Sequence, residues 1–227
     1  ILTSDVARLF GFSACISGGQ LVLSSVVNAA GKTPAVTLRT IADGIWLDIA
    51  MPEAYGGAGL GITEAAIMMR AIAESGAGMS GASAIHMNIF GLQPVVVFGT
   101  EAQKARMLPP LVAGKVKACF AVTEPNVGLD TTKIKTAAER RGDRYIIRGE
   151  KIWISTAKVA SHILLLARTT PLDKIAKRTD GLSLFYTPLD RSKIEIREIR
   201  KMGRHGVDSN MMFFDGFEIP AEDRIGE

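Results

Sequence analysis

Two short runs of this chain place aromatic and hydroxyl side chains where they could hold a flat ligand. The first run is FAVTEPNVGLD, Phe120 to Asp130, in which an apolar strand leads into a loop that contains Thr123. The second run is KIWIST, Lys151 to Thr156, and reads as a strand. Residues two apart on a strand share a face, so Trp153 could stack on a ligand that Ser155 hydrogen-bonds. This pattern is typical of a protein that grips a flavin ring by its face and its edge.

The composition is that of an ordinary globular protein. The 227 residues are 47% hydrophobic and 22% charged, enough for one large or two modest domains. No apolar run reaches the roughly 18 residues of a membrane span, and the opening ILTSDVARLF does not resemble a signal peptide. Cys15 and Cys119 lie in apolar surroundings, which favours two buried thiols in a reducing compartment over a disulfide.

The net charge of +4 comes mostly from the second half of the chain, where basic residues are frequent. These residues alternate with acidic and strand-forming ones, and only 6% of the chain is aromatic. A solvated sheet face therefore explains them better than a nucleic-acid surface, although a phosphate-bearing ligand stays compatible. The three histidines are far apart and show no ligand spacing with cysteine, so we expect no metal site.

Two kinds of periodicity divide the chain near Gly114. Before it, Thr63 is expected to cap a helix, and Thr100 with Gln103 forms a capping box for the helix that follows. Between residues 52 and 61 a glycine-rich run predicts a loop. After Gly114 the apolar residues alternate with period two, and RGD at 141–143 predicts a hairpin turn. The fold class is therefore α+β, with an all-α domain over residues 1–116 and an antiparallel β domain over 117–227.

Six motifs along the chain resemble those of acyl-CoA dehydrogenases, from Leu38 to Glu227. In order they are IAMPEAYGGAGLG, FGTEAQKARMLPPLVAGK, FAVTEPNVGLD, KIWIS, KMGRHGVDS and FEIPAEDRIGE. The resemblance implies an N-terminal helical domain, a middle β-barrel or sandwich domain, and a C-terminal helical bundle that would begin near Glu227. Residues 1–35 match poorly; they could be a divergent helix pair or a packing segment.

The resemblance implies FAD as cofactor and assigns residues to it. Phe120, Val122 and Thr123 correspond to the segment along the flavin's pyrimidine side, where backbone groups and the threonine hydroxyl are its partners. Trp153 corresponds to the tryptophan that packs against the isoalloxazine. Ser155 corresponds to the hydroxyl residue near flavin N5, which receives the hydride.

Other matching positions concern the substrate. Leu129 stands where the family usually has a serine that touches both the cofactor and the pantetheine region of the substrate. Leucine offers no hydroxyl, so Thr131 or Thr132 could substitute, or the contact could be made by backbone alone. His86 matches a position near the closed end of the acyl cavity, but a helix histidine with a local hydrogen bond is an equal alternative. Phe90 fits a core residue better than a pocket wall.

The histidines outside that cavity have simpler explanations. His205 is expected to be a solvated loop residue, and His162, at the start of an apolar strand, to be structural.

The family's reaction is the flavin-dependent oxidation of an acyl-CoA to the 2,3-enoyl-CoA, with electrons passed to an electron-transferring flavoprotein. It also needs a base for the α-proton, usually a glutamate of the C-terminal bundle. We expect structural roles for Glu53, Glu64 and Glu124, so no catalytic residue is assigned in this chain and it is expected to be inactive alone. The alternatives are a relative of flavin monooxygenases or nitroalkane oxidases, and a non-catalytic assembly subunit.

The resemblance further implies a homodimer or homotetramer of the full-length protein, in the bacterial cytoplasm or the mitochondrial matrix. Neither a nucleic-acid partner nor a membrane span is expected.

Overall fold

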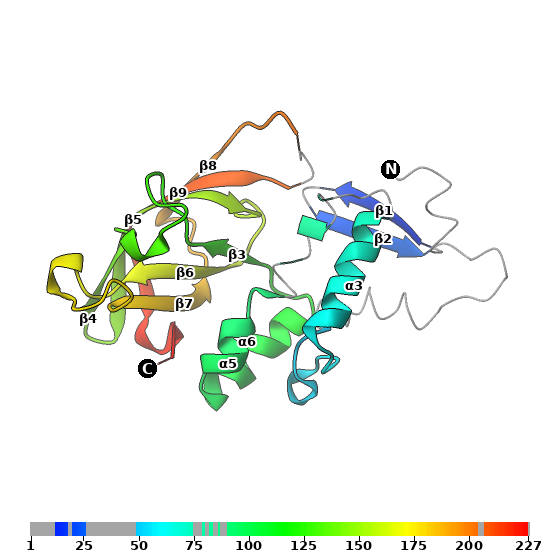
Figure 1. Ribbon diagram of the computed structural model, residues 1–227, viewed down its shortest axis with the longest axis horizontal. Coiled ribbons are helices and arrows are strands. Elements are labelled where there is room, and N and C mark those ends of the chain that lie inside the picture. The colour runs from blue at the N-terminus through cyan, green and yellow to red at the C-terminus, as the bar shows by residue number, and fades with distance from the viewer. Residues whose placement is uncertain are drawn as a thin grey trace. The chain divides into compact units, whose positions relative to one another are not determined.

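The computed structural model describes residues 12–17, 20–25, 49–74, 79, 82–83, 86, 90–203 and 207–226. The chain forms two compact units (Figure 1). The first unit comprises Ile1–Val96, Ala105–Val116 and Lys201–Val207; the second, called the β unit below, comprises Val97–Lys104, Lys117–Arg200 and Asp208–Glu227.

The first unit contains a hairpin that the sequence does not predict. Strand β1 (Phe12–Ser17) pairs antiparallel with strand β2 (Gln20–Ser25). Both runs consist of apolar and serine residues with one glutamine and carry no charge, and the apolar residues include Phe12, Ile16 and Val22, which favour strands. A divergent helix pair is therefore wrong for these residues.

The first described helix, α3 (Ile62–Ile72), begins before the predicted cap at Thr63. Its N-cap is Gly61, whose N–H donates to Oε2 of Glu64 over 2.9 Å. The carboxylate at the third helical position thus satisfies a free N–H and suits the positive end of the helix dipole. The preceding glycine-rich loop is as predicted, apart from one turn of 3-10 helix at Glu53–Tyr55. Gly57 lies so close to the chain that an added Cβ would sit 2.2 Å from the Met51 carbonyl oxygen.

Helices α5 (Gln93–Phe98) and α6 (Glu101–Val112) follow. The predicted capping box is confirmed: Thr100 N–H donates to Gln103 Oε1 over 3.0 Å, and Gln103 N–H donates to Thr100 Oγ1 over 3.2 Å. Pro109 and Pro110 do not end α6 at once, since it continues to Val112. The chain leaves the helix at Gly114, whose φ of 64° lies in the left-handed region.

The β unit is built on one eight-stranded sheet. Its strands are β3 (Ala118–Ala121), β4 (Ala137–Arg141), β5 (Arg144–Ser155), β6 (His162–Arg168), β7 (Leu182–Pro188), β8 (Ile194–Glu198), β9 (Ser209–Pro220) and β10 (Arg224–Ile225). Their order is β10-β7-β6-β4-β5-β9-β8, with β3 paired to β6. Most pairs are antiparallel, but β6 pairs in parallel with β3 and, at one position, with β4.

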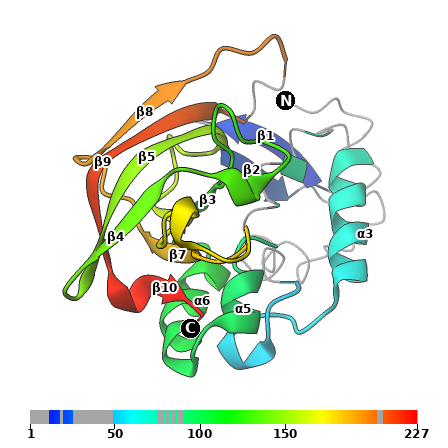
Figure 2. The same ribbon diagram turned by 60° about the vertical axis from the view of Figure 1, so that its left-hand side comes forward.

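The α+β fold class is confirmed, with a helical N-terminal part and a mostly antiparallel β domain. Among the described strands, however, the sheet is not closed into a barrel, since β8 and β10 end the pairing order. The RGD hairpin is as predicted and joins β4 to β5, where Arg141 pairs with Arg144. Figure 2 shows the long strands β5 and β9 curving side by side, in agreement with their antiparallel pairing.

The core of the β unit is an apolar cluster of side chains from several strands of this sheet. Ile147, Ile163, Leu165, Phe185 and Phe217 are fully or almost fully buried and belong to one apolar cluster. From Arg144 to Arg148, buried and more exposed residues alternate along β5 as the period-two pattern predicts, and a first register shift lies between Ile147 and Arg148. A second shift lies between Lys151 and Ile154, at the motif expected to hold the flavin.

Candidate flavin site

Trp153 occupies a β-bulge rather than a regular strand position. Lys151 pairs with Met212 and Ile154 with Asn210, so β5 carries one more residue than β9 between these pairs. Trp153 has φ of 62°, in the left-handed region that a bulky residue rarely adopts. Such a conformation costs about 1–3 kcal/mol and persists where the surroundings determine it. The bulge presents the indole outward, with 58% of the residue exposed.

The buried side chain of Asn210 holds the bulge from the neighbouring strand. Its Nδ2 donates to the Ile154 carbonyl over 2.9 Å and to Asp208 Oδ2 over 2.6 Å. An amide side chain thereby hydrogen-bonds a carbonyl at the point where the backbone register shifts. Regular alternation cannot predict this feature, because it assumes that Trp153 and Ser155 lie on an undistorted strand.

The two motifs are joined directly. Ile152 N–H donates to the Thr123 carbonyl over 2.9 Å, and Lys151 Nζ donates to the Val122 carbonyl over 2.9 Å. The loop that begins at Thr123 is thus tied to β5 next to the bulge that carries Trp153. The expected neighbourhood of Thr123 and the KIWIST strand is present within the β unit.

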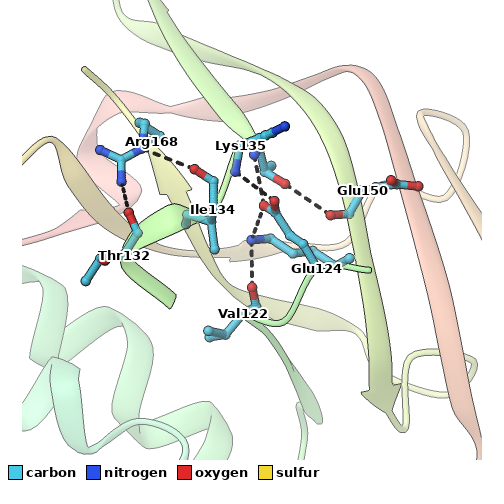
Figure 3. A network of polar contacts seen from close by, with 9 residues as sticks. Val122, Glu124, Thr132, Ile134, Lys135, Glu150 and Arg168 are labelled. Atoms are coloured by element: carbon cyan, nitrogen blue, oxygen red, sulfur yellow. Dashed lines mark hydrogen bonds and ion pairs between the residues drawn. The ribbon is translucent and has the colours of Figure 1, made fainter. Parts of the chain in front are cut away.

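A buried ion pair lies behind this junction (Figure 3). Lys151 Nζ is 3.0 Å from Oε1 of Glu124, and the two side chains are 0% and 6% exposed. The same carboxylate accepts from the backbone N–H of Lys135 over 2.7 Å and of Thr136 over 2.9 Å. Glu124 is therefore a structural residue, which agrees with the expectation from the sequence.

The pKa values of the pair reflect opposing effects. Burial raises the pKa of Glu124, but hydrogen bonds from Thr136 and Lys135 and the charge of Lys151 outweigh it and hold that pKa below its ordinary value. For Lys151 burial is the largest effect and lowers the pKa, while the Glu124 charge opposes the shift. The carboxylate is thus held ionised at neutral pH.

Three apolar side chains assigned to the flavin or substrate are exposed on the β unit. Phe120 is 43% exposed although its neighbours Cys119 and Ala121 are buried, and Trp153 is 58% exposed. Leu129 is completely exposed in the loop. Val122, Thr123 and Ser155 are half-buried. Phe120 and Trp153 therefore offer apolar area that the β unit does not itself bury.

The loop after Leu129 is held by Asp130. The Asp130 carboxylate accepts from both the hydroxyl and the N–H of Thr132, and Lys133 lies 3.3 Å from it. Asp130 thereby caps the 3-10 helix Thr131–Lys133, and the Thr132 hydroxyl is engaged by the capping carboxylate. This engagement makes Thr131 the better of the two candidates to replace the missing serine hydroxyl.

Buried Arg168 holds the other side of this loop. Its guanidinium donates to the carbonyls of Thr132 and Ile134 over 2.6 and 3.2 Å (Figure 3). It also donates to the carbonyl of Asp180 over 3.0 Å. The loop is thus connected to β6 and to the segment 169–181, which joins β6 to β7.

The remaining predicted residues lie apart from this junction in the sequence. His86 and Phe90 belong to the first unit, and His86 Nδ1 is 2.8 Å from the carbonyl of Ser83, a local helical contact. Their substrate roles stay predictions. His162 stacks on Tyr186 with ring centroids 5.2 Å apart. His205 lies outside the described residues.

Cys119 is a free, fully buried thiol whose pKa burial raises to about 12. Among the described residues, no group of three or more His, Cys, Asp or Glu side chains could hold a metal ion. None of the helices in this part of the chain is long and apolar enough to cross a membrane.

Comparison with known proteins decides the family. The N-terminal domain model of acyl-CoA dehydrogenases matches residues 24–115, and the middle domain model matches residues 119–217. The chain belongs to the acyl-CoA dehydrogenase family. Of the curated members, the Bacillus subtilis protein named "Probable acyl-CoA dehydrogenase YngJ" is 31% identical over 207 residues, covering 88% of this chain and 52% of its own length.

Solved structures of the family agree. Butyryl-CoA dehydrogenase from Megasphaera elsdenii matches with a TM-score of 0.74 and 26% identity, over 86% of this chain and 54% of its own. A chain solved in work on the electron transferring flavoprotein of Acidaminococcus fermentans matches with a TM-score of 0.75 and 27% identity, over 83% of this chain and 48% of its own. The chain spans about half the length of the curated relatives it matches.

Proposed function

We propose that the β unit supplies one part of an FAD site and that the full protein oxidises an acyl-CoA thioester to the 2,3-enoyl-CoA. The observation that carries the proposal is the direct junction of the two motifs, through Ile152 N–H on the Thr123 carbonyl and Lys151 on the Val122 carbonyl. This junction brings a hydroxyl-bearing loop next to an outward-facing indole held at a strained backbone position.

The residues fit an isoalloxazine ring, which has flat apolar faces and a polar pyrimidine edge. Trp153 and Phe120 provide exposed aromatic area for a face. The Thr123 hydroxyl and the N–H groups of Val122 and Thr123 provide donors for the edge. When bound, FAD would supply the hydride acceptor, and the protein would supply orientation and electrostatics.

The proposed role of each group follows from its chemistry. Donors at the pyrimidine edge favour negative charge there, and one such preorganised donor is typically worth about 3 kcal/mol in a transition state. Trp153 would exclude water from the ring it covers. Ser155, next to the bulge, would place a hydroxyl near the atom that receives hydride. His86, Phe90 and Leu129 keep their proposed roles in acyl and pantetheine binding.

The base that removes the α-proton is not Glu124. Its carboxylate is buried, accepts two backbone N–H groups and pairs with Lys151, and these contacts hold its pKa below the ordinary value, which makes it a poor base for a substrate proton. We propose that this chain by itself has no dehydrogenase turnover. In the full protein, electrons would pass to an electron-transferring flavoprotein. We further propose that the full protein is a homo-oligomer. Its compartment would be the bacterial cytoplasm or the mitochondrial matrix.

Titration of the purified chain with FAD, followed by visible absorption and by quenching of flavin fluorescence, tests the cofactor site. Trp153→Ala is expected to abolish or strongly weaken binding, whereas Phe98→Ala, which removes another exposed aromatic of the β unit, should leave it unchanged. A folded parent chain that binds no FAD, or equal losses in both variants, would contradict the proposed site.

Activity is tested separately. The FAD-supplied chain is mixed with acyl-CoAs of several chain lengths and an artificial electron acceptor, and acceptor reduction is recorded. No turnover is expected, and measurable turnover would refute the proposal that the chain alone lacks a base.

A further inference from the structure

The side chain of Lys151 reaches from the KIWIST run directly into the other motif. Its ammonium is fully buried and lies between the Val122 carbonyl, 2.9 Å away, and the Glu124 carboxylate, 3.0 Å away. A buried lysine is costly unless its charge is paired and its protons find acceptors. The Glu124 carboxylate pairs the charge, and both it and the Val122 carbonyl accept protons of the ammonium.

Glu124 anchors this arrangement to the start of β4. Its Oε1 accepts from Thr136 N–H as well as from Lys151, and its Oε2 accepts from Lys135 N–H. The Thr136 hydroxyl in turn donates to the Glu150 carbonyl over 3.1 Å, next to Lys151 on β5. The ion pair is thus fixed from β4, from β5 and from the loop (Figure 3).

One consequence concerns the polarity of the segment Val122–Thr123. Lys151 engages the Val122 carbonyl, and Ile152 N–H engages the Thr123 carbonyl. With both carbonyls directed into the β unit, the segment can offer a ligand its N–H groups and the Thr123 hydroxyl, which both donates and accepts. Such an edge suits an electron-rich ligand edge that gains negative charge on reduction.

We propose that Lys151 is a positioning residue for the flavin: by holding the Val122 carbonyl inward, with Glu124 as its counter-ion, it keeps Val122–Thr123 in the orientation that presents their N–H groups and the Thr123 hydroxyl to the pyrimidine edge. This inference rests on the proposed FAD site. It assigns a role to Lys151 that goes beyond the stability of the loop, and that role can be separated from stability by experiment.

The experiment uses the whole chain and the double variant Glu124→Gln/Lys151→Met. Replacing both members avoids the unpaired buried charge that a single replacement would leave. The glutamine amide can accept from only one of the two backbone N–H groups that Glu124 binds, so the double variant should melt below the parent and needs a control of similarly lowered stability. Phe217→Leu, a core change opposite Ile147, is the control, because it lowers stability without contacting the loop.

A positioning role predicts that the FAD dissociation constant rises at least about tenfold in the double variant, measured well below its melting temperature. It should remain near the parent value in the Phe217 control. A double variant that binds FAD as tightly as the parent would overturn the inference. So would a loss of affinity that merely follows melting temperature across all three proteins.

A parent chain that binds no FAD would contradict the proposed cofactor site, and hydrogen exchange then decides the inference without the cofactor. The amides of Ile152 and Glu124, which donate to the Thr123 and Val127 carbonyls, should exchange faster in the double variant and at the parent rate in the Phe217 control. Unchanged exchange at these amides would overturn the role of Lys151.

Discussion

Removing only the ammonium of Lys151 should destabilise the β unit strongly. Lys151→Met keeps the length of the side chain and deletes both of its charged hydrogen bonds, to the Val122 carbonyl and to Glu124. Hydrogen bonds of charged groups contribute about 1.5–3 kcal/mol each, and breaking one partner of a buried pair costs about 3–5 kcal/mol. Because Glu124 keeps its two backbone donors, we expect a loss of about 4 kcal/mol.

The assay is native-state hydrogen exchange of the buried amides of β5 together with urea unfolding followed by circular dichroism. Exchange reports on the β unit itself, whereas the two units of the chain need not unfold in one transition. Lys158→Met is the matched control, since Lys158 pairs with Glu198 at the surface with both side chains 53% exposed. The control should change little. A loss below about 1 kcal/mol in Lys151→Met would refute the reasoning that the pair is buried and tightly coupled.

Four further outcomes are expected from individual residues. Trp153→Gly should leave the free energy of unfolding within about 1 kcal/mol of the parent in urea melts, because glycine relieves the left-handed backbone, yet should lose FAD binding. Because the folded pKa of Glu124 lies below its ordinary value of 4.5, its stabilisation is present above that pH and declines as pH falls through the folded pKa. The stability difference between parent and Glu124→Gln should therefore shrink in acid unfolding curves, and a pH-independent difference would contradict this. At pH 8, site-resolved mass spectrometry should find Cys119 unmodified by thiol reagents until urea is added, since its thiol is buried with a pKa of about 12. Gly149→Ala should lower the midpoint of thermal unfolding by several degrees, because φ is 143° and the new Cβ would lie 2.7 Å from the Thr136 Cα; an unchanged midpoint would show that the chain can relax there.

The sequence predicts the elements of this fold well where local rules govern them. Thr100 and Gln103 cap α6 as their spacing predicts, and the RGD turn joins β4 to β5. These features depend on residues three apart or on a single tight turn. The hairpin β1–β2 and the start of α3 at Gly61 differ from the prediction, because serine-rich apolar runs are ambiguous and a glycine N-cap has no side-chain signature.

The candidate site is less predictable, because its decisive features depend on contacts between strands. Period two places Trp153 and Ser155 on one face, but the bulge opposite Asn210 depends on a neighbour more than fifty residues away. The sequence pattern does not identify Lys151 as a buried, ion-paired residue, for a similar reason. A lysine that directly follows Glu150 in a strand suggests a solvated side chain, and only the folded position of Glu124 provides its buried counter-ion.

The buried side chain of Lys151 and the outward-facing side chain of Trp153 have a common cause. Burying Lys151 directs its side chain inward, and Ile154 three residues later is also inward, which regular alternation does not allow. The extra residue of the bulge reconciles these two demands, and Trp153 absorbs it with a left-handed backbone that directs the indole outward. The buried ion pair and the exposed tryptophan are therefore two sides of one local distortion. On this argument, a change that removes the bulge would reorient Trp153 even if every side chain assigned to the flavin were kept.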